Sequence, residues 1–181
     1  MDYVEKTINK NYIFKGKILT LRCDDAELPD GKPCTREVIE HSGGACVLYV
    51  KDEKVLLVRQ YRYPMEKVTL EIPAGKLDTP EEDRLEAAKR ELREETGAVA
   101  ESIICLGDFY GSPAFVDEKI TMYAASGLSF GETELDDGEF LTTVKMPLSD
   151  AVELVMDGKI EDVKTQAAIL RAHLMREQGR L

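Results

Sequence analysis

Residues 75–98 read GKLDTPEEDRLEAAKRELREETGA, and from position 82 onward this stretch predicts an amphipathic helix, Glu82–Thr96. Its apolar positions recur at helical spacing, at Leu85, Ala88 and Leu92. Gly97 follows directly and suits the left-handed residue that ends many helices. The preceding segment LEIPAG, Leu70–Gly75, reads as a short strand that ends in a Pro and Gly turn. A strand, a polar loop and a helix are therefore expected in succession.

Three carboxylates share one face of this helix. Glu91 and Glu95 lie one turn apart, and Glu94 follows Glu91 by three residues. Like charges at this spacing destabilise a helix by roughly 0.2 to 0.5 kcal/mol per pair, and the C-terminal end of the helix dipole also disfavours anions. Arg90 and Arg93 offset part of this repulsion, but a divalent cation with hard oxygen ligands offsets it more completely. A solvated acidic face is the alternative when the motif is taken alone.

The surroundings of these carboxylates resemble the signature of the Nudix family, which is G, five residues, E, seven residues, then REUxEExGU with U a bulky apolar residue. The matching positions are Gly75, Glu82, Arg90, Glu91, Leu92, Glu94, Glu95 and Gly97. Two departures are present. Six residues instead of five separate Gly75 from Glu82, and Ala98 is smaller than the usual last residue. Neither departure changes the spacing of the carboxylates, although the longer loop leaves the role of Glu82 open.

The resemblance implies a metal-dependent hydrolase. It makes Glu91 and Glu95 the main ligands of Mg²⁺, Glu94 an additional ligand, and Arg90 a partner that orients a carboxylate. The backbone carbonyl of Ala74 completes the coordination. Mg²⁺, with Mn²⁺ as a substitute, would neutralise charge on phosphate oxygens and orient a water molecule, so that no covalent nucleophile is required.

Outside the signature, FYGSPA at residues 109–114 resembles the YxSPG segment of the ADP-ribose pyrophosphatase branch, with Ala114 in place of Gly. The order REVIEH (36–41), VRQYRYP (58–64) and LEIPAG (70–75) is also similar to that branch. This resemblance implies hydrolysis of the pyrophosphate bond of ADP-ribose to AMP and ribose 5-phosphate.

In that branch, an N-terminal β domain is exchanged across a homodimer, and the partner helps to grip the adenine and the phosphates. By this analogy Arg36 and Arg62 are candidates for contacting the diphosphate, whose oxygens fit a guanidinium fork. Ser112 and Pro113 are candidates for substrate binding. Ordinary solvated arginines and an ordinary loop are the alternatives. Glu71, within LEIPAG, has either a structural role or a place near the site.

Members of the branch supply the general base from a mobile acidic loop, which here is Gly131–Glu139. Counting back from the expected strand Phe140–Met146 puts Glu139 at a metal-contacting position and Asp137 near the position of the base. The alternative is an acidic surface loop without chemistry.

The chain is expected to form an α/β (α+β) protein, a Nudix-type α/β/α sandwich with a mixed central sheet and a small N-terminal antiparallel β domain. We place the N-terminal β meander, a dimerisation element, at residues 1–42 and the catalytic domain at 43–181. The remaining predicted elements are strands at Tyr12–Cys23, Thr35–His41, 45–50, 55–63, Val99–Gly107, Ile120–Ser126 and Phe140–Met146, and helices at Asp150–Met156, with Ser149 as N-cap, and Val163–Glu177.

The composition narrows the function classes. The chain has 181 residues, a net charge of −11 and a pI near 4.8, which argues against nucleic-acid binding through a broad basic surface. Four scattered cysteines without a CxxC pair predict reduced thiols. Because there is no signal-like apolar segment and no span long enough for a bilayer, we expect a cytoplasmic protein without membrane partners, and a homodimer by analogy.

Two other functions remain open from the sequence. The first is hydrolysis of another nucleoside diphosphate sugar, such as ADP-glucose or GDP-mannose, or of an oxidised nucleotide. The second is a sensor that binds ADP-ribose without cleaving it, although this chain has no basic helix-turn-helix segment. A purely structural module would leave the acidic helix face uncompensated.

Overall fold

The computed structural model describes residues 3–135 and 138–180, and the chain divides into two compact units. The N-terminal unit consists of Met1–Gly43 and Tyr110–Lys119, and the larger unit consists of Gly44–Phe109 and Ile120–Leu181. The N-terminal unit is therefore discontinuous in sequence.

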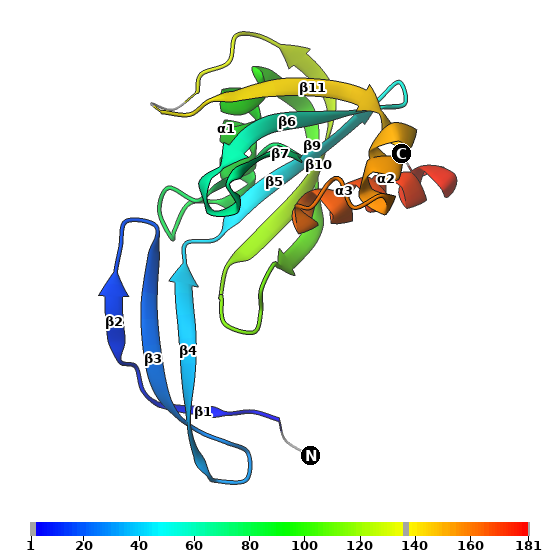
Figure 1. Cartoon of the computed structure of the whole chain (residues 1–181). Coiled ribbons are helices and arrows are strands. Elements are labelled where there is room, and N and C mark those ends of the chain that lie inside the picture. The colour runs from blue at the N-terminus through cyan, green and yellow to red at the C-terminus, as the bar shows by residue number, and fades with distance from the viewer. Residues whose placement is uncertain (1–2, 136–137, 181) are drawn as a thin grey trace. The chain divides into compact units, whose positions relative to one another are not determined.

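The N-terminal unit is built on an antiparallel sheet of four strands, β1 (Lys6–Asn9), β2 (Tyr12–Lys15), β3 (Leu19–Glu27) and β4 (Pro33–His41) (Figure 1). The strand β3 is central and pairs with each of the other three. The predicted antiparallel N-terminal sheet is confirmed, but β1 makes it more than a simple meander.

Segment Tyr110–Lys119 joins this unit through β4. Ile39 N donates to Phe115 O at 2.8 Å, and Asp117 N donates to Ile39 O at 3.1 Å. The Asp117 carboxylate also accepts from His41 N at 2.8 Å. These bonds satisfy backbone groups on the open edge of β4.

The larger unit contains a mixed sheet of seven strands in the order β11-β6-β5-β10-β9, with β7 paired to β6 and β8 paired to β5. The strands are β5 (Gly44–Lys51), β6 (Lys54–Arg62), β7 (Lys67–Glu71), β8 (Ala74–Lys76), β9 (Ala98–Tyr110), β10 (Lys119–Phe130) and β11 (Leu141–Pro147). Strands β5 and β10 pair in parallel, whereas β6 pairs antiparallel with β5, β7 and β11. Apolar runs such as 45–49 in β5 are continuous because both faces of the sheet are covered.

Helices cover the two faces of the sheet (Figure 1). They are α1 (Arg84–Thr96), α2 (Leu148–Met156) and α3 (Val163–Glu177), and a short 3-10 turn, η1, spans Tyr63–Met65. Alternate residues of β5 point to opposite faces. Cys46 and Leu48 pack in the core with α2 and α3, whereas Val47 and Tyr49 pack in the core with α1. The predicted α/β/α sandwich with a mixed sheet is confirmed.

The start of α1 lies two residues later than predicted. The helix begins at Arg84 and not at Glu82, because the Asp83 side chain caps it by accepting from Leu85 N at 2.9 Å and Glu86 N at 3.1 Å. Glu82 is thereby left in the loop before the helix.

The prediction that Ser149 is the N-cap of α2 is wrong. The helix begins at Leu148 after Pro147, with no side-chain cap. Leu148 N instead donates to Glu53 O at 2.7 Å, so a tertiary hydrogen bond satisfies one of the helix's unpaired amides. The helix α3 has the predicted bounds, and no helix in the described part of the chain is long and apolar enough to cross a membrane.

Gly97 ends α1 and also meets the acidic loop. Its φ of +66° is left-handed, and a Cβ at this position would lie 2.3 Å from the carbonyl oxygen of Gly131. Gly131 N donates to Gly97 O at 2.7 Å, and Glu134 N donates to Glu94 O at 3.0 Å. The first half of the loop is therefore held against the C-terminal end of α1.

We expect Gly97→Ala to lower the free energy of unfolding by roughly 2 to 5 kcal/mol, from left-handed strain together with the backbone clash. Gly158→Ala is the matched control, since Gly158 has a φ of +69° with no atom within 4 Å of an added Cβ. Strain alone predicts a loss of about 1 kcal/mol there. Urea unfolding measures both values, and equal losses would contradict the packing argument.

Candidate active site

The carboxyl group of Glu91 lies where a side chain at position 75 would project. Gly75 lies in β8, and a Cβ built on it would be 2.0 Å from the carboxyl carbon of Glu91. Glycine at this point leaves room for the Glu91 side chain. The close packing buries Glu91.

Glu95 lies one turn further along α1 and is 1% exposed. Its Oε2 accepts a hydrogen bond from the backbone N–H of Ala74 at 3.0 Å. The structure thus places Ala74 and Glu95, both candidate metal ligands, in contact through the amide of Ala74.

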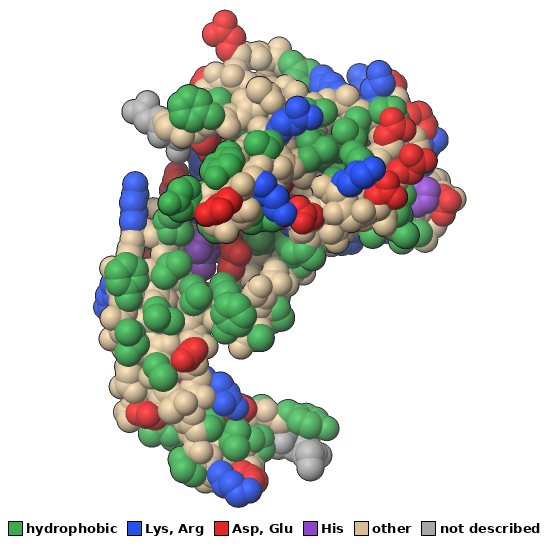
Figure 2. All heavy atoms as spheres, viewed as in Figure 1, with side chains coloured by type: hydrophobic (Ala, Val, Ile, Leu, Met, Phe, Trp, Pro, Cys, Tyr) green, Lys and Arg blue, Asp and Glu red, His purple; other side chains and the backbone are tan. Residues whose placement is uncertain are grey.

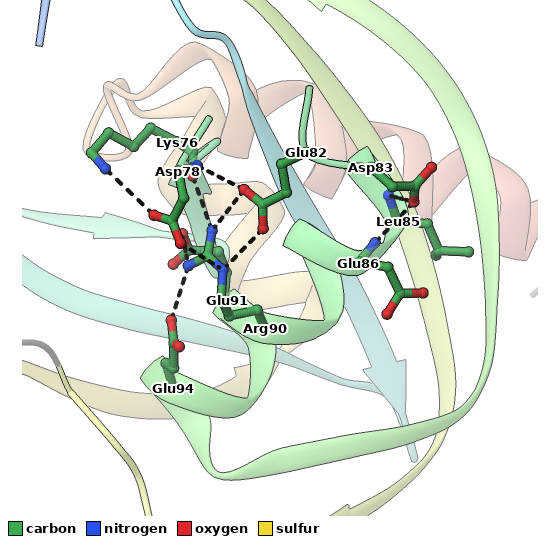
Figure 3. A network of polar contacts seen from close by, with 9 residues as sticks. All are labelled: Lys76, Asp78, Glu82, Asp83, Leu85, Glu86, Arg90, Glu91 and Glu94. Atoms are coloured by element: carbon green, nitrogen blue, oxygen red, sulfur yellow. Dashed lines mark hydrogen bonds and ion pairs between the residues drawn. The ribbon is translucent and has the colours of Figure 1, made fainter. Parts of the chain in front are cut away.

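Arg90 is paired with four carboxylates from α1 and the loop before it, Asp78, Glu82, Glu91 and Glu94 (Figure 3). Its Nη1 donates to Glu91 Oε1 at 2.9 Å and to Glu94 Oε2 at 3.0 Å. Its Nε donates to Glu82 Oε1 at 3.2 Å, and its Nη2 donates to the carbonyl of Lys76 at 3.2 Å. Arg90 therefore orients carboxylates, and Glu82 reaches it despite the longer loop.

The two buried carboxyls of α1 have raised pKa values. Burial raises the pKa of Glu91 to about 7, although Arg90 opposes the shift, and the charges of Glu94 and Glu139 add to it to a smaller extent. Burial likewise raises the pKa of Glu95 to about 8, with Glu91 and Glu139 adding to the shift. Burial is the largest cause of both shifts, and a cation bound beside these carboxyls would lower both pKa values.

The chemistry of this donor set fits a hard divalent cation. Glu91, Glu94 and Glu95 offer carboxylate oxygens, which Mg²⁺ and Mn²⁺ prefer. Among the residues that the structure describes, no three acidic, His or Cys side chains converge as a ready-made metal group. Arg90 takes up oxygens of Glu91 and Glu94 instead.

A second polar cluster lies on β6, β7 and α3. Glu71, which is 2% exposed, accepts two hydrogen bonds from Arg62, each 2.7 Å long. Thr69 Oγ1 donates to it at 2.7 Å, and Lys164 Nζ is also bonded to it. Burial acts to raise the pKa of Glu71, but Arg62 and Lys164 bring it down to about 2. Arg62 is thus a paired and oriented cation.

Two family models match the chain, one in each of its two parts. The NUDIX domain family matches residues 40–168, and the family called nucleoside diphosphate sugar hydrolase N-terminal domain matches residues 5–39. The chain belongs to the Nudix family. The helix α1 and the loop before it are therefore its Nudix box.

Similar proteins extend over almost the whole chain. An ADP-ribose pyrophosphatase of Bacillus subtilis (strain 168) is 45% identical over 168 residues, which cover 91% of this chain and 90% of the relative. The methanol dehydrogenase activator of Bacillus methanolicus is 42% identical and covers 92% and 91%. A solved structure of an ADP compounds hydrolase superposes with a TM-score of 0.84 over 100% of both chains at 24% identity, and this shows the shared fold.

The other residues singled out from the sequence are divided between the two units. Arg36, Ser112 and Pro113 belong to the N-terminal unit, whereas the Nudix box carboxylates and Arg62 belong to the larger unit. Arg36 is exposed and forms a bidentate pair with Glu5, at 2.8 Å and 2.6 Å. Ser112 O accepts from the backbone N–H groups of the turn that follows it.

The acidic loop of this Nudix protein ends beside a hollow of about 430 Å³. The hollow is lined by Arg59, Gln60, Tyr61, Val68, Leu135, Glu139, Phe140, Leu141 and Thr142. Glu139 is close enough to both Glu91 and Glu95 to raise their pKa values. Asp137, the predicted base, lies outside the described residues.

Sequence reasoning missed two members of the site region. Lys164 lies in the first turn of α3, and no motif marks it as a partner of Glu71, 93 residues away. Thr69 is one residue before LEIPAG, and its bond to Glu71 is equally unmarked. The sequence gives one indication of such partners. Glu71 is flanked by apolar residues, and a buried carboxylate needs hydrogen-bond donors or cations beside it.

The raised pKa of Glu95 predicts how the metal-free Nudix protein responds to pH. Between its ordinary pKa of 4.5 and the folded value of about 8, the folded state keeps a proton that the unfolded state releases. The associated stability is fully present below pH 4.5 and is lost as pH rises through 8. Glu95→Gln cannot ionise, so in a chelator it should be more stable than the unchanged protein at pH 8, by on the order of 2 kcal/mol.

Thermal and urea unfolding across this pH range measure the difference. It should shrink towards zero near pH 4.5, and a pH-independent difference would refute the burial argument. Glu86→Gln serves as the control, because Glu86 is an exposed acid of the same helix, paired with Lys89.

Proposed function

We propose that this Nudix protein hydrolyses the pyrophosphate bond of ADP-ribose to AMP and ribose 5-phosphate, in a reaction that requires Mg²⁺. The observation that carries the proposal is the pair of buried carboxyls, Glu91 and Glu95, whose pKa values near neutrality call for a divalent cation. The similarity to an ADP-ribose pyrophosphatase over 91% of the chain supports the choice of substrate.

In this proposal Glu91, Glu95 and Glu94 hold Mg²⁺ or Mn²⁺, together with the backbone carbonyl of Ala74 and with Glu139. When bound, the cation neutralises charge on the diphosphate and lowers the pKa of a coordinated water. Arg90 keeps the carboxylates oriented through its bonds to Glu91 and Glu94.

The substrate is held by residues of this chain with matching charge. Arg62 presents a guanidinium to the diphosphate, and its pairing with Glu71 fixes the plane of that guanidinium. Arg36 is proposed as a second diphosphate contact, and for this role it must exchange Glu5 for a phosphate. Ser112 and Pro113 are proposed to line the substrate.

The general base is proposed to come from the acidic loop. Asp137 accepts the proton of the attacking water, and Glu139 contacts the metal. The loop is anchored at its start to the C-terminal end of α1. At its end, Glu139 is close enough to Glu91 and Glu95 to raise their pKa values. If Glu139→Gln changes the pH profile of turnover and Asp137→Asn leaves turnover unchanged, the general base is Glu139 and not Asp137.

We also propose that the protein is a cytoplasmic homodimer. Apolar side chains gather on the visible surface of the N-terminal unit (Figure 2). The exposed apolar residues of this unit include Tyr12, Ile13, Phe14 and Ile18. Burying them against a second copy removes apolar area from water. If the protein is a dimer, its mass in solution should be twice 20.3 kDa.

The compartment is proposed from the cysteines. All four are free thiols, which supports a reducing compartment such as the cytoplasm.

The reaction is tested by measuring product release from ADP-ribose, ADP-glucose, GDP-mannose and dATP at one concentration, with Mg²⁺ and with a chelator. We expect AMP and ribose 5-phosphate from ADP-ribose at least about tenfold faster than products from the others, and none in the chelator. Preference for another diphosphate sugar would keep the metal site and change the substrate. Tight binding of ADP-ribose without turnover would instead identify a sensor.

The metal assignment is tested by Glu91→Gln, which keeps the shape of the side chain and removes its charge. We expect turnover to fall roughly 100-fold or more and the Mg²⁺ concentration needed for half activity to rise. Glu86→Gln is the matched control on the same helix, with activity expected within about twofold of the unchanged enzyme. Equal effects of the two variants would remove Glu91 from the metal site.

A further inference from the structure

We propose that Lys164 is a positioning residue for diphosphate binding. Its amine offsets part of the negative charge of Glu71, so that Arg62, which is paired with Glu71, keeps more of its positive charge for an anionic substrate. The inference rests on the proposed function, because it takes Arg62 as a contact of the diphosphate. Lys164 itself acts through Glu71.

The geometry of Arg62 leaves one part of its guanidinium for a ligand. Nε and Nη2 donate to the two oxygens of Glu71 at 2.7 Å each, and this two-point contact fixes the plane of the group. Nη1 makes no hydrogen bond to any residue that the structure describes. The side chain is 38% exposed, so a phosphate oxygen has access to it.

A single buried carboxylate would otherwise neutralise this arginine. In a tight one-to-one pair, the field of Glu71 cancels most of the charge that Arg62 presents to a ligand. Lys164 Nζ is bonded to the same Oε2 that accepts from Arg62, and Thr69 Oγ1 donates to Oε1. Because Glu71 then has two cations and a hydroxyl, Arg62 keeps more of its positive charge for the substrate.

The position of Lys164 explains why it acts indirectly. Its amine is buried, and its two ionic partners are Glu71 and the Asp162 carboxylate, which lies at 2.8 Å. Asp162 also caps α3 by accepting from Thr165 N at 2.9 Å, so the lysine is fixed at the start of a rigid helix. A buried lysine of this kind is costly to desolvate, and an apolar side chain of equal length would satisfy packing alone.

The experiment compares Lys164→Met, Arg62→Lys and the double variant, with the diphosphate that the unchanged enzyme cleaves best. Lys164→Met keeps the length of the side chain and removes its charge. We expect its KM to rise about tenfold with kcat within about twofold, because a ground-state contact of the diphosphate is weakened. In the double variant KM should stay within about threefold of the larger single effect, since both changes act on one interaction.

Lys67→Met is the matched control. Lys67 lies on β7, the strand that carries Glu71, and it forms an exposed ion pair with Glu161. Removing this pair should leave KM unchanged. If Lys164→Met does not fold, Thr69→Val replaces it, since it removes a donor to Glu71 and is judged by the same rise in KM and the same non-additivity with Arg62→Lys.

The outcomes separate the inference from the function on which it rests. A lowered melting temperature with unchanged KM would mean that Lys164 only supports the fold, and multiplied effects in the double variant would mean that it acts independently of Arg62. Either result overturns the inference and leaves the hydrolase intact. An Arg62→Lys variant with normal KM would overturn both the diphosphate contact and the inference, whereas an enzyme that cleaves no diphosphate fails at the proposed function.

Discussion

The close approach of α1 to β8 is the constraint on which the site depends. Glycine at position 75 leaves a space beside β8 that the carboxyl group of Glu91 occupies. Glu95, one turn later, is sealed against the backbone of Ala74. The packing that completes the core on this face of the sheet therefore also removes two carboxylates from water. Their raised pKa values follow from that burial, and a bound cation is the compensation that the donor chemistry favours.

Two clusters of the same unit show how neighbours decide the behaviour of one residue type. Glu91 and Glu71 are both buried glutamates, yet the pKa of the first is raised to about 7 and that of the second is lowered to about 2. Glu91 shares one arginine with other carboxylates, whereas Glu71 has Arg62 to itself and shares Lys164 with Asp162. The first cluster has more carboxylates than cations, and in the second they are balanced. Under the proposed function, the divalent cation would lie at the first cluster and the diphosphate would contact Arg62 in the second.

Local patterns in the sequence predicted the helices and most strands, but they missed β1 and the partners of the elements. Helical spacing and a terminal glycine predicted α1, and α3 has the predicted bounds, because amphipathic periodicity is a local property. Ser149 is not the cap because α2 already begins at Leu148, whose backbone N–H donates to the carbonyl of Glu53. Such a contact depends on the folded sheet. The pairing of Arg36 with Glu5 spans 31 residues, and that of Lys164 with Glu71 spans 93. Neither pair has the short, regular spacing that a sequence pattern can detect.

The start of α3 shows how a helix cap can serve a site. Asp162 accepts from Thr165 N, as an ordinary cap does, and Thr165 Oγ1 in turn accepts from the backbone N–H of Ile72 in the segment that follows β7. The same first turn carries Lys164 to Glu71. Asp162 supplies the cap, Thr165 fastens α3 to the segment after β7, and Lys164 brings a buried amine to Glu71, all within the first turn of the helix. A change in the cap would displace the lysine even if the helix itself remained, so stability and charge placement are coupled at this point of the fold.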